Sequence, residues 1–243
     1  MFRLGIISDV HSDIVALDQS LARVREMGCD LVVCAGDLVD GDSFPDEVIA
    51  RLAAEEIVIV IGNHDRWALE RARMIPSKWA RRKADPRTDS SDLMYEEAEA
   101  HGSGFPLSED SLKFLAQLPT SWSSSIEGLR VVMWHASFRS DMEGIYPKLT
   151  SPEQVERHLL KAEADVLIVG HTHEHFALRS SSGIIVNPGA LYTGGMSFRS
   201  ESALVVPAPG VPSGGTFAVM ELPRRLFLVY RALDGELVME SRR

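Results

Sequence analysis

Histidine and aspartate gather in five short clusters along this sequence. In chain order they are Ser8-Asp9-Val10-His11, Gly36-Asp37-Leu38-Val39-Asp40, Gly62-Asn63-His64-Asp65, His135 and Gly170-His171-Thr172-His173. These clusters hold five of the eight histidines of the chain. Imidazole nitrogen, carboxylate oxygen and one amide oxygen form a mixed ligand set that suits Mn, Fe, Zn or related divalent ions, and the absence of thiolate argues against a cysteine-based zinc site.

The candidate ligands are too many for one metal ion. Two divalent ions about 3.5–4 Å apart form a known clamp for in-line displacement at phosphorus. Each cluster alone is a weak signal, because aspartate is a common turn residue after a strand and a single histidine is more often a surface or core residue. Five clusters together favour a two-metal centre over chance.

A short apolar run precedes every cluster. The runs are Leu4–Ser8, Leu31–Ala35, Ile57–Ile61, Leu129–Trp134 and Val166–Val169. Apolar residues at nearly every position are typical of strands that are buried on both faces, as parallel strands usually are. Ligands of open α/β sheets bind at the carboxyl ends of the strands. The sequence therefore predicts that five strands deliver the clusters to one edge.

Helices are predicted between these strands and outside the sheets they form. The periodicity and capping residues predict helices over Ile14–Met27, from Pro45 onward, over Ser108–Leu118 and over Ser151–Ala164. Further strands are predicted at Trp122–Ile126, Ile184–Val186, Ala203–Val206, Phe217–Glu221 and Leu226–Arg231. The pattern indicates two sheets with helices outside and one inserted segment that begins with a helix after Asp65.

Length and composition exclude several classes of protein. The 243 residues are 45% hydrophobic, which excludes a disordered chain and suits one large domain. With 25 basic and 35 acidic residues the net charge is −10, which disfavours binding of long nucleic acid. Cys29 and Cys34 form no disulfide framework. The longest apolar run is too short to span a bilayer and no signal peptide is recognised, so a cytoplasmic location without a membrane partner is expected.

In this order, the five clusters resemble the calcineurin-like metallophosphoesterase superfamily. The resemblance implies a four-layer α/β/β/α sandwich with two central mixed β-sheets, formed by residues 1–243 as a single domain with an inserted cap at about 66–107. Gly41-Asp42 stand where protein Ser/Thr phosphatases usually carry Arg-Gly, and Ala136 follows the later histidine where they have Gly. These departures favour the small bacterial and archaeal phosphodiesterase-like branch.

The resemblance also implies roles for individual residues. One metal ion would be held by Asp9, His11 and His173, a second by Asn63, His135 and His171, with Asp37 bridging both. His64 would be the catalytic histidine near the leaving group, oriented by a hydrogen bond to Asp40. The implied reaction is hydrolysis of a phosphodiester of a small, nucleotide-type substrate by in-line attack of a metal-bridging hydroxide. The two ions could be Mn, Fe, Zn or a mixture.

Two other functions stay open at this point. The first is a phosphomonoesterase acting on nucleotides or phosphoproteins. The second is a non-catalytic metal-binding scaffold, which the complete ligand set disfavours. The oligomeric state is open as well.

Basic residues follow the third cluster. Residues 66–87 contain eight Lys or Arg against two acidic residues, although the whole chain is acidic. One hypothesis is that Arg66, Arg81 and Arg82 hold a second phosphate or a nucleotide above the metals, with Trp67 among the aromatic residues that could stack on a base. The alternative is a solvated helix that pairs with the acidic segment 89–110.

Overall fold

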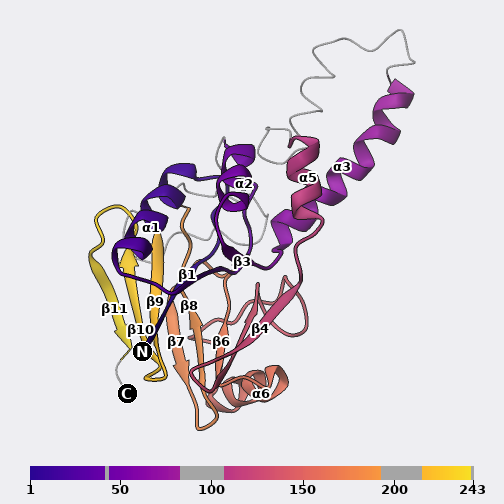
Figure 1. Ribbon diagram of the computed structural model, residues 1–243. Coiled ribbons are helices and arrows are strands. Elements are labelled where there is room, and N and C mark those ends of the chain that lie inside the picture. Colours follow the sequence, from indigo (N-terminus) through magenta and orange to yellow (C-terminus); the bar gives the residue numbers. More distant parts are fainter. Residues whose placement is uncertain (42–43, 83–106, 193–214, 242–243) are drawn as a thin grey trace.

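The computed structural model describes residues 1–41, 44–82, 107–192 and 215–241, and only the backbone of residues 74–82 (Figure 1). The cap beyond Arg82, the side chains of Arg81 and Arg82, and the predicted strand Ala203–Val206 lie outside this description. That residues 1–243 form one domain stays a prediction.

Two mixed sheets form the centre of the described fold. The first has the order β11-β10-β9-β1-β2-β3 and the second the order β4-β5-β6-β8-β7. The first contains β1 (Phe2–Ile7), β2 (Leu31–Cys34), β3 (Ile57–Ile59), β9 (Thr216–Leu222), β10 (Leu226–Arg231) and β11 (Leu237–Ser241). The second contains β4 (Ser121–Ile126), β5 (Leu129–Trp134), β6 (Val166–Ile168), β7 (Phe176–Arg179) and β8 (Ile184–Asn187). β1, β2 and β3 run parallel, as do β5, β6 and β8.

Alternating side chains of the strands build three apolar layers. Leu4 and Ile6 of β1 face the second sheet and pack in one core with residues such as Met133 and Ile168. Ile7 points the other way, into the core beneath α1 (Ile14–Glu26), α2 (Pro45–Ala53) and α5 (Glu109–Leu115). On the outer face of the second sheet, α6 (Pro152–Ala162) packs through its own apolar residues. The predicted four-layer α/β/β/α sandwich is confirmed.

The capping residues behave as the sequence predicts. The Asp13 side chain accepts from the backbone N–H of Ala16 at the start of α1. Ser108 caps α5 in the same way, and Ser151 and Gln154 form a reciprocal capping box at α6. Helix α3 (Asn63–Arg82) begins inside the third cluster and extends away from the sheets (Figure 1). This confirms the helix predicted at the start of the cap.

Two strands were not predicted from the sequence. β7 and β11 lie at the outer edges of their sheets, and most of their residues are only partly buried. An edge strand pairs on one side only and needs no continuous apolar run, so its local pattern is weak.

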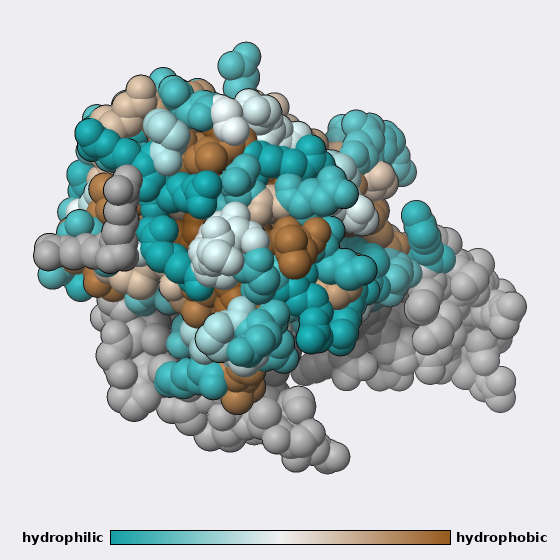
Figure 2. Space-filling view, turned by 90° about the horizontal axis from the view of Figure 1, so that it is seen from below, coloured by the Kyte–Doolittle hydropathy of each residue, from teal (hydrophilic) through white to brown (hydrophobic). Residues whose placement is uncertain are grey.

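The described surface contains no extended apolar area on the face seen in Figure 2, where hydrophilic residues separate small hydrophobic groups. Within the described ranges, no helix has both the length and the apolar content that crossing a membrane requires. Cys29 and Cys34 are free thiols, as expected.

Candidate metal centre

The five clusters meet where strands of both sheets end. They begin within three residues of the ends of β1, β2 and β3 in the first sheet and of β5 and β6 in the second. Asp9, His11, Asp37, Asn63 and His135 are almost completely buried, each with at most 2% of its surface exposed. The sheets therefore bring together all seven side chains that the resemblance implies as metal ligands.

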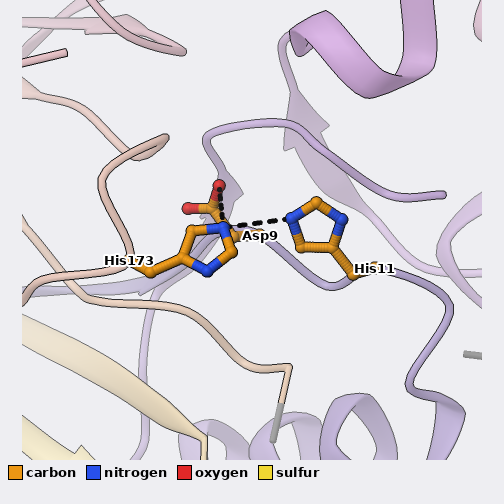
Figure 3. Close-up of side chains that lie close together, drawn as sticks. All are labelled: Asp9, His11 and His173. Atoms are coloured by element: carbon orange, nitrogen blue, oxygen red, sulfur yellow. Dashed lines mark hydrogen bonds and ion pairs between the residues drawn. The ribbon is translucent and has the colours of Figure 1, made fainter. Parts of the chain in front are cut away.

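A first group consists of Asp9, His11 and His173 (Figure 3). His173 Nε2 lies 3.5 Å from Asp9 Oδ1 and 3.1 Å from His11 Nε2. The Asp9 carboxylate also accepts a 2.6 Å hydrogen bond from the Ser8 hydroxyl and two bonds of 3.1 Å from the backbone N–H of His171. The carboxylate is thus held in place from both sheets.

A second group consists of Asp37, His135 and His171, together with the amide of Asn63. Asn63 Oδ1 lies 2.9 Å from His135 Nε2 and 2.9 Å from His171 Nδ1. Asp37 connects this group to the first, because its Oδ2 lies 3.2 Å from His135 Nε2 and 3.8 Å from His11 Nε2.

Backbone carbonyl groups decide which ring nitrogen of two histidines faces the site. His11 Nδ1 lies 2.7 Å from the Asp40 carbonyl oxygen, and His135 Nδ1 lies 2.7 Å from that of Ala35. A carbonyl oxygen only accepts, so both Nδ1 atoms carry the proton and donate it. Nε2 of each ring is the atom turned toward the site, which is the arrangement that metal-binding histidines usually show. The donor set therefore fits divalent metal ions.

Burial and neighbouring charged groups together shift the pKa values of the side chains in the site. Burial by itself would raise the pKa of the Asp9 and Asp37 carboxyls, but the adjacent His173 and His135 outweigh it and lower both pKa values below the ordinary range. Burial lowers the pKa of His11 to about 4, so this ring is neutral near pH 7. Burial would also lower the pKa of His135, but Asp37 raises it to about 10. Metal binding must therefore displace a proton from His135.

The backbone of the site loops is strained. Six candidate residues are among the ten described non-glycine residues with positive φ, and their φ angles range from 45° to 68° (Asp9, His11, Asp37, Asp40, His171 and His173). Such left-handed conformations are unfavourable for L-residues with side chains and concentrate at functional sites. Gly62 is required by a close approach, because a Cβ there would lie 2.1 Å from Asp37 Oδ1.

Asp65 is a structural residue of the site whose role the sequence did not reveal. Its buried carboxylate accepts hydrogen bonds from the backbone N–H groups of Asp37, Leu38, Val39 and Gly62. Burial and the charge of Asp37 raise its pKa to about 7. Asp65 therefore holds the loop after β2 against the start of α3. In the sequence, only its position at the end of the cluster Gly62-Asn63-His64-Asp65 indicates that it belongs to the site.

We expect Asp65→Ala to destabilise the fold, because it leaves four buried N–H groups without their acceptor. Each unsatisfied buried group costs about 1–3 kcal/mol, so the free energy of unfolding should fall by roughly 3 kcal/mol or more. Asp65→Asn keeps one acceptor oxygen and should lose about half as much. Urea denaturation of metal-free protein at pH 8 measures both. Asp110→Ala, at an exposed aspartate of α5, is the control, and an Asp65→Ala curve that matches it would contradict this role.

The two predicted catalytic residues lie together at the edge of the ligand groups. His64 Nδ1 is 3.3 Å from Asp40 Oδ2, and both residues are buried. The His64 ring also contacts the rings of His11 and Trp67, with centroid distances of 4.9 Å and 4.8 Å. The catalytic role of His64 and the orienting role of Asp40 stay predictions.

Arg66 is engaged by two carboxylates. Its Nε donates to Asp141 at 2.7 Å and its Nη1 to Glu70 at 2.8 Å. Asp141 belongs to the segment after β5, which lies opposite the first turn of α3. A role of Arg66, Arg81 and Arg82 in substrate binding stays a prediction.

Comparison with known proteins identifies the family. Residues 2–206 match the family model of the calcineurin-like phosphoesterase superfamily domain. The chain belongs to this superfamily. The family that the five clusters predicted is thereby confirmed, and membership supports metal-dependent hydrolysis of phosphoesters.

This calcineurin-like phosphoesterase is similar to proteins from archaea and bacteria. It is 23% identical over 199 residues to an uncharacterized protein of Methanocaldococcus jannaschii, covering 78% of the chain and 70% of that protein. A metallophosphoesterase from Sphaerobacter thermophilus aligns with a TM-score of 0.66 at 22% identity, over 95% of this chain and 87% of that one. The Escherichia coli phosphoesterase YfcE aligns with a TM-score of 0.54 at 18% identity, over 99% and 98% of the two chains. These structures share the fold.

Proposed function

We propose that this calcineurin-like phosphoesterase is a dinuclear metal-dependent phosphodiesterase that hydrolyses small, nucleotide-type substrates. The observation that carries the proposal is the position of Asp37, whose Oδ2 faces the imidazoles of both ligand groups. One carboxylate between two sets of donors is the arrangement that two neighbouring ions require.

Seven side chains would hold the two ions. Asp9, His11 and His173 would bind one, Asn63, His135 and His171 the other, and Asp37 both. With divalent ions held by these residues, the site would lower the pKa of a bound water and neutralise charge on the phosphoryl oxygens. The set brings only two carboxylates, so the loaded site has excess positive charge, which suits a phosphate anion.

His64 would act on the leaving group. A carboxylate only accepts, so the Nδ1 of His64 that faces Asp40 carries a proton, and Nε2 would be the atom that acts on the substrate. An imidazolium in that orientation can donate a proton to the leaving ester oxygen.

Gly41 supports the distinction from protein phosphatases. It occupies the position where those enzymes usually carry arginine, and a Cβ there would lie 2.5 Å from the His11 carbonyl oxygen. This backbone leaves no room for a side chain, so the arginine usual in protein phosphatases has no counterpart at this position.

Metal analysis and a pair of substrates test the proposal. Protein loaded with Mn²⁺ should contain about two ions per chain. It should hydrolyse bis-p-nitrophenyl phosphate faster than p-nitrophenyl phosphate, and Fe²⁺ and Zn²⁺ should be compared in the same assay. A strong preference for the monoester would favour a phosphomonoesterase instead. Absence of hydrolysis with all three metals would favour a metal-binding scaffold.

A further inference from the structure

Arg71 of α3 contacts Asp40, which in turn contacts His64. Its Nη2 lies 2.5 Å from both carboxylate oxygens of Asp40. Asp40 Oδ2 in turn faces His64 Nδ1. The three side chains form a continuous chain of polar contacts from guanidinium to carboxylate to imidazole.

The helical repeat explains why Arg71 reaches this place. His64, Trp67 and Arg71 are separated by three and four residues, so they lie along one face of α3. Trp67 packs edge-on against the His64 ring between the two polar residues. Asp40 lies in the loop after β2 and contacts this face of α3 through His64 and Arg71.

The environment of Asp40 shows what Arg71 contributes. Asp40 is 8% exposed and has a positive φ of 64°, so its carboxylate is both buried and held on a strained backbone. Arg71 supplies the opposite charge that a buried carboxylate needs and contacts both of its oxygens. Asp40 is therefore fixed in the rotation that faces His64.

Packing alone does not explain why residue 71 is an arginine. Its Nε is buried and has no hydrogen-bond partner within the part of the chain that the structure describes. An unpaired buried donor is unfavourable, and an aliphatic side chain would fill the same space without it. The guanidinium is therefore present for its contact with Asp40.

We propose that Arg71 is a positioning residue that anchors Asp40 and thereby orients His64 toward the leaving group. The inference rests on the proposed function. In the step concerned, the bond between phosphorus and the leaving oxygen breaks, a water oxygen forms the new bond to phosphorus, and the proton of His64 Nε2 moves to the leaving oxygen. The proton released by the water restores protonated His64 through solvent.

This role predicts a dependence on the leaving group. An alkoxide is a poor leaving group that needs the proton, whereas p-nitrophenolate leaves readily without one. Arg71→Ala should lower kcat for a dinucleoside phosphodiester on the order of 10²-fold, but for bis-p-nitrophenyl phosphate less than about fivefold, with KM little changed. Arg71→Lys, which keeps the charge but not the planar guanidinium, should be intermediate. A purely structural role would lower both rates alike.

Two further measurements separate positioning from folding. Arg71→Ala added to Asp40→Asn should cause no further loss, because Arg71 acts through Asp40. In protein labelled with ¹⁵N-histidine, the resonance of the His64 Nδ1 proton should be lost or shifted in both single variants. Arg157→Ala, at an exposed arginine of α6, is the matched control and should resemble wild type. Metal content and melting temperature are measured for every variant. If Arg71→Ala does not fold, the same comparison of the two diesters is made with Arg71→Lys.

Equal losses with the two diesters, or independent effects of Arg71→Ala and Asp40→Asn, would overturn the positioning role. Wild-type protein that hydrolyses neither diester with any of the three metals would overturn the proposed function, and this inference with it. The two failures are distinguished by the wild-type rates alone.

Discussion

Asp37→Asn is expected to lower kcat/KM for phosphoester hydrolysis by about 10³-fold or more and to reduce the metal content of the protein. Asparagine keeps the size of the side chain but removes its negative charge and replaces one oxygen with a nitrogen that only donates. Asp37 Oδ2 is the atom that faces both His135 and His11. The substitution therefore removes the shared ligand of both groups at once.

Activity and metal content must be measured together for this variant. Atomic absorption after loading with Mn²⁺ gives the number of ions per chain, and bis-p-nitrophenyl phosphate gives the rate. Asp18→Asn is the control, because Asp18 is a half-exposed aspartate of α1 whose partner is Arg51. Since Asp37 Oδ1 also accepts a 2.8 Å hydrogen bond from the His64 N–H, the melting temperature of the metal-free proteins shows any loss of stability. Full activity with two ions per chain in Asp37→Asn would show that the assignment of the site is wrong.

His64→Gln is expected to lower kcat by about 10²- to 10⁴-fold for a diester with an alkyl leaving group, which is the usual contribution of general acid catalysis. Glutamine can still donate a hydrogen bond but cannot supply a proton. KM should change little, since His64 acts on the leaving oxygen in the transition state and the metal ligands are intact.

Metal analysis of this variant decides between two roles of His64. Its ring lies close enough to His11 and Asp37 for the three to form a possible ligand group. If His64 is the proton donor, His64→Gln keeps about two ions per chain. If the metal content falls in step with the rate, His64 is a ligand instead. His158→Gln serves as the control, because His158 lies on α6 against the Phe138 ring.

The candidate ligands could be read from the sequence because their signals are local. A buried parallel strand is an apolar run of a few residues, and its end is marked by the polar residues that follow. The carboxyl ends of such strands share one edge of a sheet, so five runs followed by Asp, Asn or His already predict a common site. Helix caps such as Asp13 and Ser151 are equally local, and the structure confirms both. The net charge of −10, in contrast, does not indicate that the chain carries a site for metal ions and phosphate.

Other features depend on contacts between segments far apart in the chain, which the sequence did not predict. Asp65 holds the loop at Asp37, 28 residues away, and Arg71 holds Asp40, 31 residues away. Arg66, predicted to face a substrate, meets Asp141, 75 residues away. The edge strands β7 and β11 form because neighbouring strands offer free hydrogen-bonding groups, and their own residues carry little pattern. The sequence by itself thus determined which chemistry is present, because residue types and strand ends are local properties. Only the tertiary structure decided which charges face one another, because those distances are set by the packing of whole sheets and helices.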